Sequence, residues 1–257
     1  MLKTFLKRAA RTVGYDIIRA DQGSDALPVE FSKADADVLN FVLDHKLTLV
    51  SRQRLIATIN ACKHAVLAET DGDFAECGVW RGGNAIAAKL TFDNYGSSKR
   101  IYLFDTFAGM TAPTEYDTSR FEGRSADEQF EQARREGHNE WCFASLDDVR
   151  ANFSKAGIDP GDIHFVRGDV VKTLADRINL PDAISVLRLD TDFYDSTKAE
   201  MELLYPLLST RGSLLIDDFG YWDGSRKAIV EYLEALPPSE RPLLHYTDFT
   251  GRMAVKP

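Results

Sequence analysis

Cysteine is scarce in this chain of 257 residues, and its apolar runs are short. The three cysteines, Cys62, Cys77 and Cys142, are scattered without the spacing of zinc ligands, so we expect no zinc site and a reduced, cytoplasmic protein. No apolar run reaches the roughly 20 residues that a membrane-spanning helix needs. The sequence therefore predicts a protein without a transmembrane segment.

An excess of positive charge is also absent, since the formal net charge is -9 at pH 7. Binding to nucleic-acid phosphates requires a basic surface, so we expect no nucleic-acid partner. Residues 1–20 are a basic exception, in which apolar residues recur at helical spacing and lysines and arginines lie largely off that stripe. Basic residues interrupt this segment throughout, so it lacks the apolar core of a signal peptide.

The helix predicted for residues 1–20 has three candidate docking surfaces. We favour its own domain or a second subunit, and the latter would make the chain a homo-oligomer. Weak contact with an anionic membrane surface is the alternative. It is less favoured because stable adsorption needs more apolar area or a second anchor.

Helical and strand patterns divide the chain into a helical extension, residues 1–70, and an α/β domain, residues 71–257. In the extension, helices are expected at 34–42 and 52–68, the second with Ser51 as its N-cap. Short apolar runs at 74–79, 101–104, 163–166, 184–189 and 213–216 then alternate with helical patterns at 84–90, 146–156, 197–208 and 225–236. This alternation predicts a mostly parallel sheet with helices on both faces. Asp195 or Ser196 is the expected N-cap of the helix at 197–208.

The first predicted strand runs into ECGVWRGGN, which begins at Glu76. Gly78 and Gly82 allow a tight turn and a close approach to a ligand, although the spacing differs from the dinucleotide fingerprint G-x-G-x-x-G. The second predicted strand ends at Asp105, and Thr106 follows it. A carboxylate at the end of this strand commonly binds both hydroxyls of a ribose. An ordinary strand–helix turn is the alternative for the glycines alone. We interpret this region as a cofactor site because acidic residues lie at the ends of two successive strands.

Four aspartates follow two further predicted strands. Asp190 and Asp192 follow the strand at 184–189, whereas Asp217 and Asp218 follow the strand at 213–216. One right-handed crossover joins these strands, so they can be neighbours whose carboxylates converge at one edge of the sheet. Such carboxylates repel one another unless a cation lies between them, and oxygen ligands suit Mg²⁺, with Mn²⁺ or Ca²⁺ as alternatives. An ion-pair network is the competing explanation.

In this order and spacing, GDFAECGVWRGGNA, LFDTFAGM, LRLDTDFYDST and LLIDDFG resemble the motifs of the macrocin O-methyltransferase family. The resemblance implies a class I methyltransferase fold, which is Rossmann-like, with S-adenosylmethionine and Mg²⁺ as cofactors. It also implies a small-molecule acceptor, namely a hydroxyl of a sugar or of a glycosylated compound. It is weaker in the first part of the chain, in segment 112–142 and at the C-terminus.

The resemblance assigns roles to individual residues. By motif, the metal ligands are Asp190, Asp217 and Asp218, and the general base is Asp192. The cofactor-binding residues are Glu76, Gly78, Gly82, Asp105, Thr106 and Asp190, with Gly168 and Asp169 after the third strand, near the adenine. Relatives commonly have Asp-Gly-Asp at residues 190–192, so Thr191 of this chain adds a side chain beside the metal.

The expected reaction is an in-line displacement at the methyl carbon. Mg²⁺ on the acceptor hydroxyl would lower its pKa, and Asp192 would take the proton. Segment 112–142 is long, polar and rich in charge, which predicts a lid that excludes water, with His138 and Arg124 as contributors. His138 is the second candidate for the base, since a lone loop histidine is usually solvated.

Two other functions fit parts of the sequence. The Asp190/Asp192 pair has the D-x-D form that binds a metal–diphosphate in glycosyltransferases, but the glycine loop and the pair Asp217-Asp218 argue against this function. A non-catalytic module of the same fold, which recruits a partner through the basic N-terminal helix, is the third candidate. The intact set of carboxylates argues against that loss of catalysis.

Overall fold

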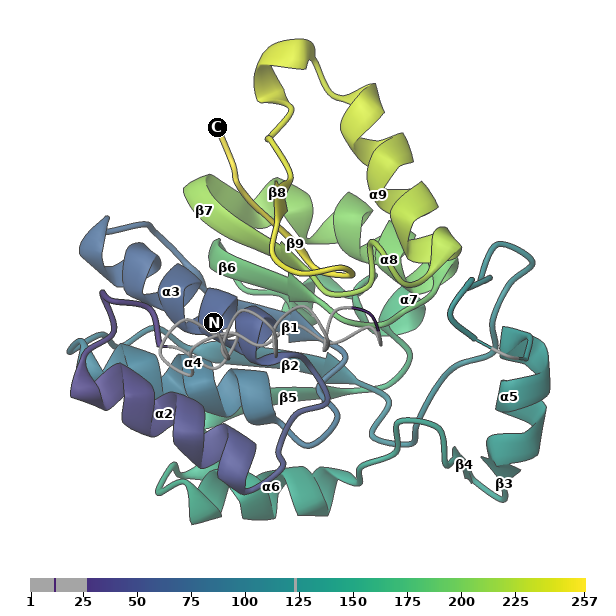
Figure 1. Ribbon diagram of the computed structural model, residues 1–257, viewed down its shortest axis with the longest axis horizontal. Coiled ribbons are helices and arrows are strands. Elements are labelled where there is room, and N and C mark those ends of the chain that lie inside the picture. Colours follow the sequence, from purple (N-terminus) through teal and green to yellow (C-terminus); the bar gives the residue numbers. More distant parts are fainter. Residues whose placement is uncertain (1–11, 13–26, 123) are drawn as a thin grey trace.

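A seven-stranded sheet forms the centre of the protein (Figure 1). The computed structural model describes residue 12, residues 27–122 and residues 124–257. Apart from residue 12, the helix predicted for residues 1–20 lies outside the described residues.

The strands lie in the order β5-β2-β1-β6-β7-β9-β8. Five of them run parallel: β5 (Ile163–Arg167), β2 (Ile101–Asp105), β1 (Asp73–Cys77), β6 (Ile184–Leu189) and β7 (Leu208–Ile216). At one edge, β9 (Arg252–Val255) pairs antiparallel with β7, and β8 (His245–Tyr246) pairs antiparallel with β9. The mostly parallel sheet is confirmed, and the predicted neighbours β6 and β7 are paired, with Leu189 opposite Ile216.

Helices cover both faces of this sheet, as predicted. One face packs against α2 (Lys33–Asp44), α3 (Arg52–Leu67), α4 (Gly83–Asn94) and α6 (Leu146–Lys155). The other face packs against α7 (Val170–Thr173), α8 (Tyr194–Leu203) and α9 (Asp223–Ala235). Alternation along each strand supplies the two cores: Phe74 of β1 belongs to the first and Ala75 to the second.

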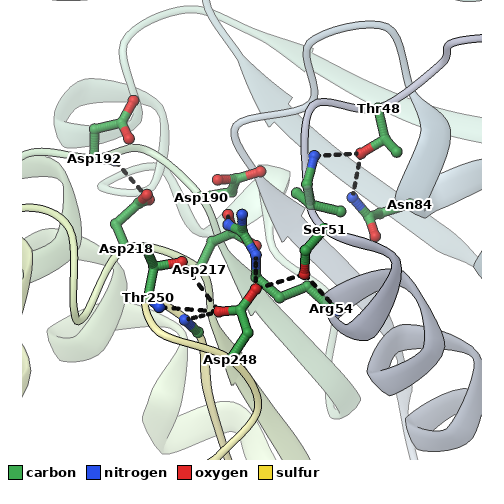
Figure 2. A network of polar contacts seen from close by, with 12 residues as sticks. Thr48, Ser51, Arg54, Asn84, Asp190, Asp192, Asp217, Asp218, Asp248 and Thr250 are labelled. Carbon is green, nitrogen blue, oxygen red and sulfur yellow. Dashed lines mark hydrogen bonds and ion pairs between the residues drawn. The ribbon is translucent and has the colours of Figure 1, made fainter. Parts of the chain in front are cut away.

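The helices α2 and α3 confirm the two predicted for the extension, and they share the first core with β1. Leu39 of α2 and Ile59 of α3 are fully buried there. Ser51 is the N-cap of α3, as predicted, since its hydroxyl accepts a hydrogen bond from the N–H of Arg54 at 3.2 Å. Figure 2 shows Ser51 and Arg54, at the start of α3, beside Asp190 and Asp217, which follow β6 and β7.

The prediction for the helix at 197–208 was wrong at both ends. The helix α8 begins at Tyr194, three residues early, and ends at Leu203, while Leu208 already opens β7. Neither Asp195 nor Ser196 caps it: Phe193 occupies the N-cap position, and the carboxylate of Asp117 accepts from the N–H of Tyr194. The cap comes from a distant segment, which local sequence patterns do not reveal.

Segment 112–142 contains regular structure that the sequence did not predict. It forms α5 (Ala126–Ala133) and a two-stranded hairpin of β3 (Arg134–Arg135) and β4 (His138–Asn139), to one side of the main sheet in Figure 1. The N–H of Asn139 donates to the carbonyl of Ala108 at 2.7 Å, which ties the hairpin to the loop after β2. Short 3₁₀ turns lie at Pro160–Asp162, Arg177–Asn179, Tyr205–Leu207 and Pro238–Glu240.

Candidate active site

A cavity of about 380 Å³ opens at the carboxyl ends of β1, β2, β6 and β7. This is the edge at which open parallel sheets bind ligands, and the volume is within the range of small-molecule sites. Its walls come from the loops after these strands, from segment 47–50 before α3, from the lid and from Phe249-Thr250 after β8. Of the predicted site residues, those that line it are Gly78, Asp105, Thr106, Asp190, Asp192, Asp217 and Asp218.

Gly78 directly follows β1 and lies against the backbone of Asp190, which follows β6. Its φ of +79° and its surroundings both require glycine, since a Cβ atom would lie 1.8 Å from the carbonyl oxygen of Asp190. The N–H of Asp190 in turn donates to Cys77 at 2.9 Å. The glycine loop and the acidic loop are therefore packed directly on each other.

Asp105 organises the glycine loop from the end of β2. One carboxylate oxygen accepts from the N–H of Val79 at 2.6 Å, and the other accepts from the N–H of Phe107 at 2.6 Å. Burial raises the pKa of Asp105, although these backbone N–H groups oppose the rise. Thr106 lies beside it and donates to the carbonyl of Gly109 at 2.6 Å. The Asp105 carboxylate thus faces the cavity from a fixed position.

Four predicted cofactor residues do not line the cavity. Glu76 is 1% exposed, and its carboxylate accepts from Arg188 at 3.0 Å. Gly82 precedes α4 with a φ of +86° and faces Val149 and Phe153. Gly168 donates to the carbonyl of Asp105, and Asp169 caps α7 through the N–H of Val171. These four residues shape the loops behind the cavity.

Asp190, Asp217 and Asp218 converge as the sequence predicted. Each offers a carboxylate oxygen, and these three oxygens lie within 4.8 Å of one another. Figure 2 shows Asp192 beside this group, where its backbone N–H donates to Asp218 at 3.3 Å. Asp192 has a φ of +68°, an uncommon conformation for a residue with a side chain. The turn after β6 therefore brings two carboxylates to the same cavity.

Two arginines that the sequence patterns did not predict accompany the carboxylates. Arg188 of β6 donates to Asp190 at 2.7 Å and to Asp217 at 2.6 Å. Arg54 of α3 contacts the other oxygen of Asp217 and donates to Asp248 at 3.0 Å. The expectation that these carboxylates repel one another without a bound ion was thus incomplete, because guanidinium groups neutralise part of their charge.

Carboxyl groups still outnumber the arginines in this cluster. The cluster has two arginines and six carboxyl groups, which are those of Glu76, Asp190, Asp192, Asp217, Asp218 and Asp248. Desolvation and the charge of Asp190 raise the pKa of Asp192 to about 7. Burial and neighbouring carboxylates likewise raise the pKa values of Asp217 and Asp218. A divalent cation would favour the ionised forms of these groups, and their oxygen donors and close spacing fit a hard cation.

Thr191 lines the cavity, but its hydroxyl binds outside the group Asp190, Asp217 and Asp218. Its hydroxyl donates to Glu200 of α8 at 2.7 Å, and Glu200 is fully buried. Burial raises the pKa of Glu200 to about 8, and Thr191 opposes this rise. The side chain that distinguishes Asp190-Thr191-Asp192 from Asp-Gly-Asp therefore anchors the turn to α8.

The lid places aromatic residues, and not His138, against the cavity. Trp141 lines it together with Tyr221 and Trp222, and the rings of Trp141 and Trp222 are 5.9 Å apart. His138 packs against Phe143 at 4.7 Å and is not among the described residues that line the cavity. Arg124 binds the side chain of Gln132 on the exposed surface of the lid. The structure thus brings Asp192 to the cavity and leaves His138 outside it.

Residues 22–244 match the family model described as macrocin-O-methyltransferase (TylF). The chain belongs to this family. The protein is accordingly an O-methyltransferase, and neither a glycosyltransferase nor a non-catalytic module is favoured by the match. The resemblance seen in the sequence motifs is confirmed.

Two similar proteins are also O-methyltransferases by name. The 8-demethyl-8-(2,3-dimethoxy-alpha-L-rhamnosyl)-tetracenomycin-C 4'-O-methyltransferase of Streptomyces olivaceus is 32% identical over 188 residues, 72% of this chain and 67% of that protein. The mycinamicin III 3''-O-methyltransferase of Micromonospora griseorubida is 29% identical over 187 residues, 72% of this chain and 69% of that protein.

The solved structure of the O-methyltransferase NovP is similar in fold. It has a TM-score of 0.70 and 23% identity, and the alignment covers 82% of each chain. This likeness and the strand order show the class I methyltransferase fold that was expected. As for membranes, none of the described helices combines the length and the apolar character that crossing a bilayer requires.

Proposed function

We propose that this O-methyltransferase transfers the methyl group of S-adenosylmethionine to a hydroxyl of a sugar or glycosylated small molecule, with Mg²⁺ held by Asp190, Asp217 and Asp218. The observation that carries the proposal is the convergence of three carboxylate oxygens within 4.8 Å, next to the glycine loop. One relative is named for a rhamnosyl-tetracenomycin, which supports a glycosylated acceptor.

The glycine loop and the end of β2 fit the nucleoside cofactor. Gly78 leaves the backbone free of a side chain at the cavity wall, and the Asp105 carboxylate is at the place where ribose hydroxyls are bound in related folds. Once bound, S-adenosylmethionine supplies an electrophilic methyl carbon. Glu76, Gly82, Gly168 and Asp169 support these loops from behind.

The acidic turn holds and deprotonates the acceptor. Mg²⁺, when bound, lowers the pKa of a coordinated hydroxyl. Asp192 lines the same cavity on the turn that carries Asp190, so we assign to it the removal of the hydroxyl proton. The lid residue Trp141, with Trp222 opposite, excludes water and presents apolar ring faces to the acceptor.

The charge of the cavity favours an uncharged acceptor. Arg54 is the single cationic side chain among the described lining residues, and Asp217 and Asp248 already bind it. A nucleotide sugar brings a diphosphate that would meet carboxylates such as Glu122. We therefore propose a neutral glycoside as the acceptor and not a nucleotide sugar.

The test is methyl transfer from labelled S-adenosylmethionine to a panel of neutral glycosides and nucleotide sugars, with and without a metal chelator. We expect product only with neutral glycosides and only with divalent metal. Thermal stabilisation by S-adenosylhomocysteine checks the cofactor site separately. Full turnover in excess chelator would contradict the role of Mg²⁺, and transfer to nucleotide sugars alone would contradict the acceptor class.

A further inference from the structure

Arg188 is a charged residue inside the sheet. It belongs to β6, in which every residue is buried, and its side chain is 2% exposed. Its guanidinium group touches the carboxylates of Glu76, Asp190 and Asp217 at 3.0, 2.7 and 2.6 Å. Glu76 lies near the end of β1, and Asp190 and Asp217 directly follow β6 and β7, so the three residues belong to adjacent strands of the sheet.

Glu76 is a buried partner of Arg188. It is buried, it does not line the cavity, and its other oxygen has no hydrogen-bond partner among the described residues. A buried arginine without a carboxylate would be strongly unfavourable, so this pair fixes the position of the guanidinium group. Its planar fork then orients Asp190 and Asp217 at fixed angles, which a lysine ammonium cannot do.

We propose that the pair Glu76–Arg188 is a positioning unit that sets the spacing of Asp190 and Asp217 for binding a divalent cation. The inference rests on the proposed function, since it assumes the metal site of Asp190, Asp217 and Asp218. Partners that orient metal ligands from behind commonly change metal affinity by about 10–100-fold when they are replaced. Arg188 and Glu76 act through the ligands and touch neither metal nor acceptor.

The experiment measures Mg²⁺ affinity directly, by calorimetry with magnesium chloride, in the wild type, Arg188→Lys and Glu76→Gln. For both variants we expect Mg²⁺ binding about 10–100-fold weaker and turnover that is restored at high Mg²⁺ concentration. Arg188→Lys keeps the positive charge but not the two-pronged guanidinium group, and Glu76→Gln keeps the shape of the side chain but replaces its carboxyl group by an amide. Affinity for S-adenosylhomocysteine should stay close to that of the wild type, since neither residue lines the cavity.

The matched control is Lys63→Met, which also removes a buried cation from a carboxylate, that of Asp35 at 2.8 Å. This variant should lose thermal stability and keep wild-type Mg²⁺ affinity, which separates positioning from a general loss of stability. If Arg188→Lys does not fold, Glu76→Gln carries the test. Wild-type Mg²⁺ affinity in a folded Arg188 or Glu76 variant would overturn the positioning role alone. A wild-type protein that binds no Mg²⁺ would overturn the proposed metal site, and this inference with it.

Discussion

The carboxylate of Asp117 accepts a hydrogen bond from the N–H of Tyr194 at 2.7 Å, so a lid residue caps the helix that follows the acidic turn. The other oxygen of Asp117 binds the N–H of Thr114 at 2.6 Å, and the side chain is 2% exposed. Gly224 leaves room for it, since a Cβ atom there would lie 1.9 Å from Asp117. The lid is therefore built onto the starts of α8 and α9.

Replacing this cap should affect both stability and catalysis. We expect Asp117→Ala to lower the free energy of unfolding by about 1–2 kcal/mol, because it removes a helix cap and leaves Tyr194 N–H unpaired. Turnover should also fall, since the turn with Asp192 directly precedes α8. Urea denaturation and initial rates measure the two effects. Ser32→Ala, which removes the cap of α2, is the control and should change stability alone.

Asp190→Asn should remove the metal site and spare the cofactor site. The amide keeps the shape of the side chain but not its charge, so Mg²⁺ binding and turnover should fall by at least about 100-fold. Thermal stabilisation by S-adenosylhomocysteine should remain. Asp195→Asn, on the exposed side of the next turn, should resemble the wild type. Equal activity of both variants would contradict the assignment of Asp190.

Gly78→Ala tests the contact between the two loops. The new methyl group would meet the Asp190 carbonyl and the backbone would keep a positive φ, so we expect a loss of about 2–5 kcal/mol in unfolding free energy. Gly96→Ala is the matched control. Its φ is +68°, but nothing lies within 4 Å of the added atom, so only about 1 kcal/mol should be lost. Similar losses in the two variants would show that backbone strain dominates.

The buried pair Asp35–Lys63 predicts how stability depends on pH. Burial opposes ionisation of Asp35, but hydrogen bonds from Lys63 and Ser32 outweigh it, and the pKa of Asp35 is lowered. The charged carboxylate therefore stabilises the fold above the unfolded pKa of about 3.9, and this contribution is lost as pH falls through the folded pKa.

At neutral pH, Asp35→Asn should reduce the unfolding free energy by about 3 kcal/mol, since it leaves Lys63 without its charged partner. The difference from the wild type should shrink as the pH of the denaturation experiments is lowered toward the folded pKa of Asp35. Asp37→Asn, in an exposed pair with Lys33, should change stability by less than about 0.5 kcal/mol at any pH. A difference for Asp35→Asn that is constant with pH would contradict the prediction.

Sequence patterns predicted most of the parallel sheet, because buried strands such as β6 are short, apolar and rich in branched side chains. They did not predict β8, whose two residues are exposed, or β9, whose pairing with β7 depends on distant chain segments. The start of α8 was misplaced for the same reason, since its cap is Asp117.

The residues of the candidate site that could be predicted are those that directly follow a strand. Asp190, Asp217 and Asp218 follow their strands, and parallel pairing alone brings them together. Arg54 could not be predicted, since its contact with Asp217 depends on how α3 packs against the sheet. Arg188 did leave a signal: a charged residue within an apolar strand needs a buried partner.

The space beside Gly78 also limits how this enzyme can be recombined with its relatives. A chimera that took the glycine loop from one parent and the turn after β6 from another would have to reproduce a contact with no room for one added carbon atom at Gly78. Exchanges that keep both segments from the same parent avoid this collision. Replacement of the lid segment alone, residues 112–142, keeps the glycine loop and β6 from one parent and therefore suits the grafting of a foreign lid onto this scaffold.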